Sequence, residues 1–438
     1  MQPISNLWYT NDMLRFNENN EIITEEKYRA ILVGLQRRED ISYSMEELAG
    51  LAEAANAQVL GKVVQVLEKP NTATLIGKGK VEEVAELVRN MEADMVIFND
   101  ELTGMQLRNL EDAMDVRVID RTILILDIFA SRADSREGKL QVELAQLKYR
   151  MPRLTGFGKS LSRLGGGIGT RGPGEKKLET DRRHIERRMD DIKSELAQLV
   201  KTRSVQRAKR EKSGIPVVAL VGYTNSGKSA LMNRLLSVAD KSEKSVKEKD
   251  MLFATLDTQQ RSVKLDTNHE FILIDTVGFV SKLPHSLVEA FKATLEEVLY
   301  ADLLLHVVDA SYEENVFHIE VTNKVLSEIG AGAKEKVMVF NKIDLNPDFQ
   351  APVTNLSNLF VSAKEDINID QLIDKIKEIV FADKVDAKLM IPYTRGDLSS
   401  YLCEKALVRS MEYLEEGTLF DVELNQEDYQ RLKEYDTI

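Results

Sequence analysis

The chain has 438 residues, of which 43% are hydrophobic and 30% are charged, and this composition is ordinary for a soluble protein of about two to four domains. The sequence has no uncharged apolar run of membrane-spanning length and no signal peptide at its start, and its single cysteine excludes a disulfide framework and a multi-cysteine metal site. We therefore expect a cytoplasmic protein without a membrane span.

The net charge of −13 is unevenly distributed along the chain. Residues 148–212 contain nineteen Lys/Arg and eight Asp/Glu, a net charge of +11, which leaves 40 Lys/Arg and 64 Asp/Glu, a net charge of −24, in the remaining chain. This segregation indicates either a segment that meets a polyanion such as nucleic acid or long helices whose charged faces are solvated. Composition alone does not choose between the two interpretations.

The first 135 residues predict a helical entry and then a small α/β subdomain. Residues 1–55 are interpreted as an N-terminal helical extension, because apolar residues recur at three- and four-residue spacings in Glu25–Gln36 and Met45–Asn56. Residues 56–135 alternate between strand and helix patterns, which predicts a small, mostly parallel sheet. The predicted strands are Val59–Leu67, Met95–Asn99 and Val116–Ile119, and the predicted helices are Lys80–Met91 and Thr103–Met114.

Residues 136–213 predict an antiparallel helical hairpin. One apolar seam consists of Leu140, Leu144, Leu147 and Met151, and a second with coiled-coil spacing consists of Ile185, Met189, Ile192, Leu196 and Leu199. The connection between them, residues 152–175, contains eight glycines and several basic residues and would form the tip of the hairpin.

Residues 214–383 predict a doubly wound α/β domain. Its candidate strands PVVALVG, FILIDT, LLLHVVDA and VMVFNK are near-continuous apolar runs, as expected for parallel strands that are covered on both faces. Residues 384–438 mix helix and strand patterns and predict a small C-terminal α+β domain.

Residues 222–229 read GYTNSGKS and match the phosphate-binding pattern G-x-x-x-x-G-K-[ST] between a predicted strand and a predicted helix. Backbone N–H groups of such a loop surround the phosphates at a helix N-terminus. Lys228 would bridge the β- and γ-phosphates, and the Ser229 hydroxyl would bind Mg²⁺. The predicted nucleotide-binding residues here are Gly222, Tyr223, Thr224, Asn225, Ser226, Gly227, Lys228, Ser229 and Ala230. This match alone leaves ATP and GTP open.

A second motif, Asp275-Thr276-Val277-Gly278, follows the strand FILI. Asp275 would hold Mg²⁺ through water and the Gly278 N–H would meet the γ-phosphate, although an acidic turn at a strand end is the alternative interpretation. A switch threonine should complete the site. We favour Thr255 for this role, with Thr258 as the alternative. The predicted catalytic residues are thus Lys228, Thr255 and Gly278, and the predicted metal ligands are Ser229, Thr255 and Asp275.

Two further motifs predict selectivity for guanine. In NKID, residues 341–344, the Asp344 carboxylate would accept hydrogen bonds from guanine N1–H and the exocyclic amine, which adenine does not offer in that arrangement. In SAK, residues 362–364, the Ala363 N–H would donate to guanine O6. The other base-binding candidates are Asn341, Lys342, Ser362 and Lys364. All four motifs in order, each at the end of a strand, predict a site for GTP and GDP with Mg²⁺.

Phe279 occupies the position after Gly278 where many GTPases have a glutamine that orients the attacking water. A phenyl ring cannot make that hydrogen bond. We therefore expect slow hydrolysis by the protein alone, with help from a backbone group, Mg²⁺ and a partner. An interpretation of Phe279 as a packing residue leads to the same expectation.

The sequence resembles the bacterial HflX family of ribosome-associated GTPases over residues 58–438. The motifs that carry the resemblance are RLGGGIGTRGPGE (163–175), GYTNSGKSALMN (222–233), LFATLD (252–257), DTVGFVSKLPHSLVEAF (275–291) and ADLLLHVVDAS (301–311). The resemblance implies an α/β fold with a central P-loop GTPase domain, an N-terminal α/β domain with a helical hairpin, and a small C-terminal domain. It also implies a monomer that binds the large (50S) ribosomal subunit and splits stalled or idle 70S ribosomes in its GTP form.

The resemblance further implies that the hairpin tip reaches ribosomal RNA near the peptidyl-transferase region. The RNA-binding candidates are Arg153, Arg163, Gly165, Gly166, Gly167, Arg171 and Gly172. Glycine lets backbone approach RNA closely, and arginine pairs with phosphates or stacks on bases. The chain departs from the family at Ser226 and Ala230, and at Thr258-Gln259, which weakens the assignment of the switch threonine.

Two other functions are compatible with parts of the pattern. One is a GTPase that acts in assembly of the 50S subunit and leaves on hydrolysis. The other belongs to a different class, an ATP-driven RNA remodeller or P-loop kinase, and would leave Asp344 unexplained.

Overall fold

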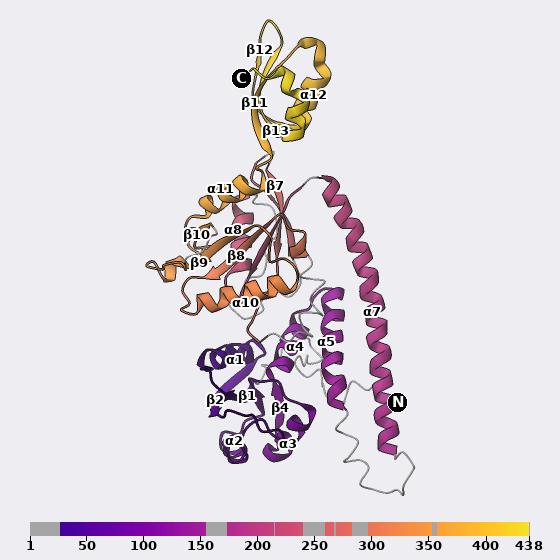
Figure 1. Cartoon of the computed structure of the whole chain (residues 1–438), viewed down its shortest axis with the longest axis vertical. Coiled ribbons are helices and arrows are strands. Elements are labelled where there is room, and N and C mark those ends of the chain that lie inside the picture. Colours follow the sequence, from indigo (N-terminus) through magenta and orange to yellow (C-terminus); the bar gives the residue numbers. More distant parts are fainter. Residues whose placement is uncertain are drawn as a thin grey trace, which may run out of the picture. The chain divides into compact units, whose positions relative to one another are not determined.

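The computed structural model describes residues 27–154, 173–213, 215–239, 259–266, 269–282, 297–352 and 357–437 (Figure 1). The chain divides into two compact units. One contains Met1–Ser131 and Glu143–Asp190, and the other contains Arg132–Val142 and Asp191–Ile438.

The first unit is built on a four-stranded parallel sheet with the order β2-β1-β3-β4. Its elements in chain order are β1 (Tyr28–Gln36), α1 (Ser42–Ala54), β2 (Ala57–Val66), α2 (Lys78–Met91), β3 (Met95–Phe98), α3 (Gly104–Met114), β4 (Arg117–Asp120) and α4 (Arg121–Arg132). Helix α3 begins at a capping box in which the side chains and backbone N–H groups of Thr103 and Gln106 bond reciprocally. The predicted alternation of strands and helices is confirmed.

The helix predicted over Glu25–Gln36 is wrong, because Tyr28–Gln36 forms strand β1 between β2 and β3. Residues Ala30–Leu35 are an almost unbroken apolar run that is buried on both faces of the sheet. Such a run satisfies helical spacing by coincidence, and its length is typical of a buried parallel strand. The N-terminal extension predicted for residues 1–55 therefore contributes β1 and α1 to the sheet domain, and residues 1–26 lie outside the described residues.

Helices α5 (Arg136–Leu154) and α7 (Pro173–Ser213) run antiparallel to one another, as their apolar seams predict. Arg188 forms an ion pair with Glu143 at 2.7 Å, and Arg136 forms one with Glu195 at 2.7 Å. Between the helices, Leu140, Leu144, Met189 and Ile192 are buried. Residues 155–172, most of the predicted tip, lie outside the described residues.

The central domain contains a six-stranded sheet with the order β10-β9-β8-β5-β7-β6, in which only the β6–β7 pair is antiparallel. Its strands are β5 (Val217–Gly222), β6 (Gln259–Lys264), β7 (Glu270–Asp275), β8 (Leu303–Asp309), β9 (Lys336–Asn341) and β10 (Asn358–Phe360). Its helices include α8 (Lys228–Ala239), α10 (Asn315–Glu328), α11 (Ile369–Val380) and the short η2 (Ile343–Leu345).

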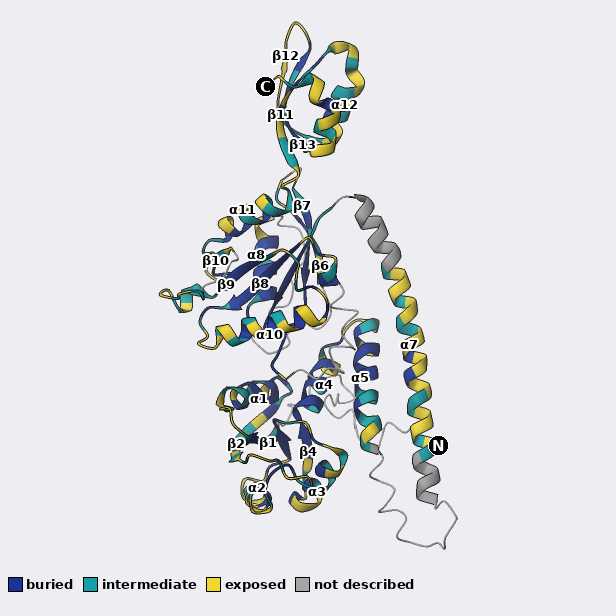
Figure 2. Cartoon of the chain, viewed as in Figure 1, coloured by how far each residue is buried: buried dark blue, intermediate teal, exposed yellow. Residues whose placement is uncertain are grey.

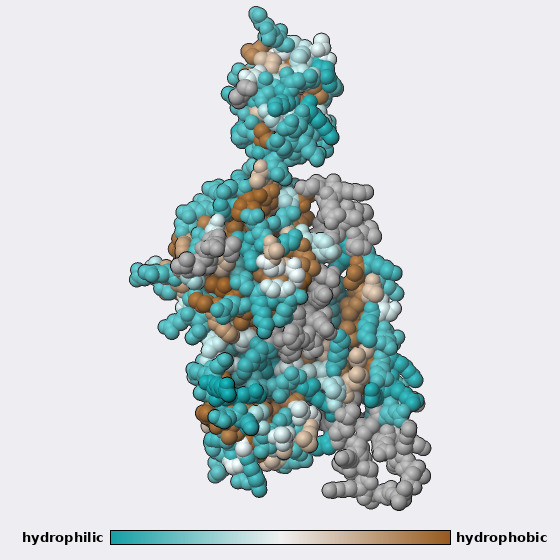
Figure 3. Space-filling model, viewed as in Figure 1, coloured by the Kyte–Doolittle hydropathy of each residue, from teal (hydrophilic) through white to brown (hydrophobic). Residues whose placement is uncertain are grey.

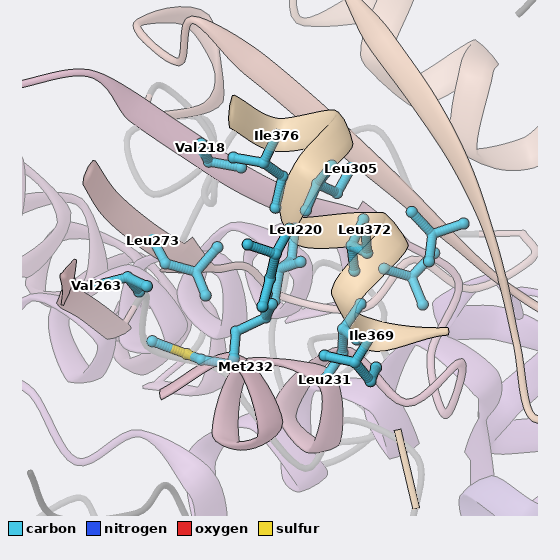
Figure 4. Close-up of a cluster of buried hydrophobic side chains, with 14 of the residues drawn as sticks. Val218, Leu220, Leu231, Met232, Val263, Leu273, Leu305, Ile369, Leu372 and Ile376 are labelled. Carbon is cyan, nitrogen blue, oxygen red and sulfur yellow. The ribbon is translucent and has the colours of Figure 1, made fainter. Parts of the chain in front are cut away.

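Helices cover both faces of this sheet, so the doubly wound fold is confirmed. Val218 and Leu220 of β5 pack with α8 and α11 in one apolar cluster (Figure 4), whereas Ala219 and Val221 pack with α10 in another. Central strands are consequently buried along their length, while α10 and α11 each keep an exposed outer face (Figure 2).

The C-terminal part is a small α+β domain with an antiparallel sheet in the order β11-β13-β12, as predicted. Its elements are β11 (Lys384–Ile391), η3 (Tyr393–Arg395), α12 (Gly396–Lys405), β12 (Leu407–Tyr413), β13 (Thr418–Asn425), α13 (Gln426–Leu432) and η4 (Lys433–Tyr435). Its visible surface is mostly hydrophilic (Figure 3). In the part of the chain that the structure describes, no helix has both the length and the apolar character needed to cross a membrane.

Candidate nucleotide-binding site

The carboxyl ends of β5, β7 and β9 bring the predicted nucleotide motifs to one edge of the central sheet. Strand β5 enters the phosphate loop at Gly222, β7 ends at Asp275, and β9 ends at Asn341. Open α/β sheets bind ligands at the carboxyl edge of their parallel strands. The four motifs, which are separated by up to about 140 residues of sequence, are therefore parts of a single site.

The loop between β5 and α8 has the backbone shape that a phosphate-binding loop requires. Asn225 and Gly227 have φ angles of 60° and 88°, in the left-handed region that glycine adopts easily. A Cβ atom on Gly227 would overlap Nδ2 of Asn341, so glycine alone fits there. Helix α8 begins directly after the loop, and its N-terminal N–H groups and dipole favour an anion.

Lys228 lies buried beneath the phosphate loop. Its Nζ donates hydrogen bonds to the carbonyl oxygens of Gly222 at 3.1 Å and Tyr223 at 2.7 Å. Burial lowers the pKa of Lys228 to about 8, against the opposing effect of the Asp275 carboxylate. A phosphate anion in the loop would stabilise the charged ammonium, because the two carbonyls carry only partial negative charge.

Ser229 and Asp275 are joined across the start of α8 and the end of β7. The Ser229 hydroxyl donates to Oδ2 of Asp275 at 2.6 Å, and the Asp275 side chain is fully buried. The hydroxyl of Thr276 donates to the carbonyl of Leu220 at 2.7 Å and holds the next residue against β5. A hydroxyl and a carboxylate side by side are the kind of hard oxygen donors that Mg²⁺ prefers, so these residues fit the predicted ion.

Asn341 connects the phosphate loop to the segment after β10. Its Nδ2 donates to the Ser226 carbonyl at 3.0 Å, and its Oδ1 accepts from the Ala363 N–H at 3.0 Å. The prediction placed this Ala363 N–H against guanine O6. In the structure Asn341 uses it instead, so a contact with the base would have to share or replace that hydrogen bond.

The Lys342 side chain contacts the phosphate loop. Its Nζ donates to the Asn225 carbonyl at 2.9 Å and forms an ion pair with Asp309 at 2.7 Å. Its φ of 64° turns the chain sharply after β9 and leads into η2, which carries Asp344. Asn341 and Lys342, two of the base-binding candidates on NKID, are thus hydrogen-bonded to the phosphate loop itself.

Among the buried oxygens at this edge, Oδ1 of Asp344 and Oγ of Ser226 have no hydrogen-bond partner among the described residues. Leaving a buried acceptor unsatisfied costs roughly 1–3 kcal/mol. The Asp344 oxygen lies where the sequence predicts the N1–H and amine donors of guanine. A ligand with these donors would remove the penalty.

Phe279 points away from the site and into the core. Its side chain is 2% exposed and packs with Val221 and Ile274. The preceding Gly278 approaches the phosphate loop so closely that a Cβ atom there would lie 2.6 Å from the Cα of Thr224. Phe279 is therefore a packing residue, and it also has no group that could orient a water molecule, so the two interpretations of this position are compatible.

Three family models match successive parts of the chain. They are described as GTP-binding GTPase N-terminal over residues 42–130, GTP-binding GTPase Middle Region over residues 132–210, and 50S ribosome-binding GTPase over residues 217–342. Their order agrees with the N-terminal sheet domain, the helical hairpin and the central domain of the structure.

Curated proteins named GTPase HflX match nearly the whole length. The protein from Caldanaerobacter subterraneus subsp. tengcongensis is 49% identical over 415 residues, which cover 95% of each chain. The protein from Alkalihalophilus pseudofirmus is 44% identical and covers 92% of this chain and 96% of its own. The Escherichia coli protein is 39% identical and covers 92% of this chain and 95% of its own. The chain belongs to the HflX family of GTPases.

Membership of the HflX family confirms the resemblance that the motifs predict and establishes GTP hydrolysis as the activity. Guanine nucleotide binding follows from the same membership. The alternative class, an ATP-driven remodeller or P-loop kinase, is thereby set aside.

Several predicted residues of this HflX chain lie outside the described residues. These are both switch-threonine candidates, Thr255 and Thr258, and the tip residues Arg163, Gly165, Gly166, Gly167, Arg171 and Gly172. Within the SAK motif, Ser362 is buried and its Oγ accepts the Glu365 N–H at 3.0 Å, whereas Lys364 is exposed and pairs with Glu365 at 3.8 Å.

Arg153 is the one tip candidate within the described residues, and it contacts protein groups on several sides. Its Nε and Nη2 donate to the Leu102 carbonyl at 3.1 and 2.8 Å, and Nη1 donates to the Tyr149 carbonyl at 2.8 Å. Nη2 also bonds Glu101 at 3.0 Å, and the guanidinium lies 3.3 Å from the centre of the Tyr149 ring. These contacts compete with the RNA contact that the family resemblance implies.

Sequence reasoning missed two parts of the site. Asp309, the partner of Lys342, ends the apolar run of β8, so the rule that places ligand residues at strand ends would have found it. The hydrogen bond from the Ser281 N–H to the Tyr223 hydroxyl gives no signal in the sequence, because its partners are 58 residues apart.

Proposed function

We propose that this protein, as a monomer in the cytoplasm, binds the large ribosomal subunit in its GTP form and splits stalled or idle 70S ribosomes. The observation that carries the proposal is the hairpin of α5 and α7, whose two ends are joined by a glycine-rich basic segment, residues 155–172. This hairpin also contains most of the segment with a net charge of +11. A basic, glycine-rich sequence between two long helices suits contact with RNA phosphates and bases.

The family model over residues 217–342 supports the same proposal, because its description is that of a 50S ribosome-binding GTPase. A ribosome-bound form would make use of both parts of the chain. The hairpin tip would contact ribosomal RNA near the peptidyl-transferase region, and the nucleotide site would set how long the complex lasts.

For the nucleotide itself, we propose that Lys228 and the N–H groups of residues 225–229 bind the phosphates and that Asp344 binds guanine. The buried ammonium of Lys228 and the unsatisfied Oδ1 of Asp344 support these roles. Ser229 and Asp275 would hold Mg²⁺, with a threonine from the segment around Thr255 as a third ligand. The ion would supply charge neutralisation at the phosphates.

We further propose that hydrolysis is slow until the ribosome supplies a missing element. The Phe279 side chain is buried, so the side chain at this position cannot align the attacking water. The Gly278 N–H, close to Thr224, is the group of this segment that would meet the γ-phosphate. The rate of hydrolysis at the nucleotide site would then set how long the protein stays bound to the ribosome.

Arg153 takes a different role from the one that the resemblance implies. We propose that it fixes the end of α5 on the N-terminal sheet domain through Leu102 and Glu101, and that RNA is contacted by the residues that follow. It would thus set the starting point of the tip.

The proposal is tested by sedimentation of purified 70S ribosomes with the protein and a non-hydrolysable GTP analogue. We expect conversion into 30S and 50S peaks, with the protein in the 50S fraction. Deletion of residues 156–174 should leave intrinsic GTP hydrolysis intact and remove the splitting, and Arg431→Ala, an exposed change in the C-terminal domain, serves as the control. Intact 70S ribosomes at saturating protein would refute the splitting function.

The same gradients separate splitting from a role in assembly. An assembly GTPase would bind immature 50S particles from growing cells and leave the 70S peak unchanged. Loss of both hydrolysis and splitting on deletion of the tip would show that residues 156–174 are needed for folding rather than for RNA contact.

A further inference from the structure

Three hydrogen bonds join the segment after Gly278 to the phosphate loop. The Phe279 N–H donates to the Gly222 carbonyl at 3.1 Å, and the Thr224 N–H donates to the Phe279 carbonyl at 2.7 Å. The Ser281 N–H donates to the hydroxyl of Tyr223 at 2.7 Å. The first two bonds form a short parallel bridge between Tyr223 and Phe279, and the third extends it through a side chain.

The Tyr223 side chain is held in place from the other side by α10. Its ring stacks on the imidazole of His318 with centroids 3.8 Å apart and planes 11° from parallel. Tyr223, His318 and Ser281 are each less than 9% exposed. The ring is therefore directed into the protein, and its hydroxyl is aimed at the backbone of the segment that follows Gly278.

We propose that Tyr223 is a positioning residue that keeps Gly278 in register with the phosphate loop and so favours GTP over GDP. The inference rests on the proposed contact between the Gly278 N–H and the γ-phosphate. Only GTP has that phosphate, so only GTP gains from a Gly278 that is already in place. Fixing a contact group before binding lowers the entropy lost on binding.

The stack on His318 and the hydrogen bond to Ser281 have different roles. His318 fixes the direction of the Tyr223 ring, and the hydroxyl then fixes Ser281, three residues beyond Gly278. The close approach of Gly278 to Thr224 leaves little room for the segment to shift along the loop. A residue that merely filled the core would need the ring but not the hydroxyl.

The test measures affinities of the purified full-length protein, without ribosomes, for GDP and for a non-hydrolysable GTP analogue. Tyr223→Phe keeps the ring that stacks on His318 and removes the hydroxyl that accepts from the Ser281 N–H. We expect the affinity for the analogue to fall roughly threefold to tenfold, the range for one buried hydrogen bond, with GDP affinity unchanged. His318→Ala should also lower the ratio of the affinity for the analogue to the affinity for GDP, because the Tyr223 ring loses its stacking partner. Tyr312→Phe is the matched control, because Tyr312 lies on His318 at 5.3 Å but is 41% exposed.

Each other outcome overturns the inference in a distinct way. Equal affinities of Tyr223→Phe and the natural protein for both nucleotides would reduce Tyr223 to a packing residue. An equal fall for GDP and the analogue would place the effect in the phosphate loop rather than at Gly278. Gly278→Ala, whose added Cβ would clash with Thr224, tests the γ-phosphate contact of Gly278 itself, separately from its positioning by Tyr223. If Gly278→Ala keeps the natural protein's preference for GTP, the proposed contact between Gly278 and the γ-phosphate is wrong, and not only the positioning role of Tyr223.

Discussion

The N-terminal sheet and the mainly parallel central sheet both place polar side chains at the carboxyl ends of their strands, here called the N-terminal edge and the central edge. The two edges differ in whether the protein itself satisfies the hydrogen bonds of these side chains. In the N-terminal sheet, Asp120 at the end of β4 accepts N–H groups from Leu102 at 2.9 Å and Ile123 at 3.0 Å, and the Tyr149 hydroxyl as well. Arg121 beside it pairs with Glu47, and Nη1 of Arg121 donates to Asn99 at 3.1 Å. In the central sheet, Asp344 and Ser226 keep buried oxygens that no described residue satisfies.

This difference shows that strand-end polar residues do not by themselves make a binding site. At the N-terminal edge the protein supplies partners for both oxygens of Asp120 and for the two terminal nitrogens of Arg121, and these contacts connect β4 with α1 and α5. Burial raises the pKa of Asp120, and its hydrogen bonds oppose that effect. At the central edge Asp344 and Ser226 lack such partners, and in our proposal a nucleotide would supply them. We infer that a strand-end carboxylate whose oxygens are both bonded within the protein indicates a structural edge, and that one with an oxygen left unbonded indicates a binding edge.

The largest expected effect is on the N-terminal edge. Arg121→Ala would leave the Glu47 carboxylate buried without its guanidinium, and breaking a buried pair in this way costs about 3–5 kcal/mol of folding stability. Chemical denaturation of the purified protein measures the loss. The exposed pair between Arg29 and Glu92 gives the matched control, and Arg29→Ala should change stability far less. Similar losses in the two variants would contradict the assignment of Arg121 to a structural network.

At the central edge, removal of a charged group should affect binding instead of stability. Lys228→Ala removes a buried ammonium that the phosphates would stabilise, and we expect GTP and GDP affinities to fall at least about a hundredfold. The melting temperature without nucleotide should stay close to that of the natural protein, because the lost partners are two carbonyls. A large fall in melting temperature would mean that Lys228 is part of the scaffold and would remove the contrast between the edges.

A smaller effect is expected at the base. Asp344→Asn exchanges one acceptor for a donor and should weaken GTP binding about tenfold to a hundredfold while it improves binding of xanthosine triphosphate. Competition between the two nucleotides gives the selectivity directly. Arg431→Ala, at an exposed residue of the C-terminal domain, is the control and should keep the preference for guanine. An unchanged preference in Asp344→Asn would show that another group selects the base.

Most of the binding edge can be predicted from the sequence, because each motif is a short local pattern at the end of an apolar strand. The contacts that tie the motifs together cannot, because their partners are far apart in the chain. Asn341 and the Ala363 N–H are 22 residues apart, and Tyr223 and Ser281 are 58 apart. The contacts of the N-terminal edge are even harder to predict from the sequence, because Glu47 and Arg121 are separated by 74 residues and neither belongs to a motif.

The error over β1 has a related physical cause. The run AILVGL over residues 30–35 is buried on both faces, so its spacing does not distinguish a strand from a helix. Only the pairing of β1 with β2 and β3 decides the matter, and that pairing is a property of the whole sheet. The doubly wound central domain escapes the same ambiguity because the phosphate loop fixes a strand before it and a helix after it.

The smallest expected effect is the dependence of nucleotide affinity on pH. Burial lowers the pKa of Lys228 to about 8 in the protein without nucleotide, whereas the phosphate charges would raise it in the complex. Below pH 8 the ammonium is charged in both states, so affinity should not change with pH. Above pH 8 the free protein loses the proton and binding must take it up again, so GDP affinity should fall by up to about tenfold for each pH unit. Asp344→Asn should keep this slope, because it leaves Lys228 in place. A flat profile to pH 9 would mean that Lys228 stays charged in the free protein, and the binding edge would then hold its cation as firmly as the N-terminal edge holds Arg121.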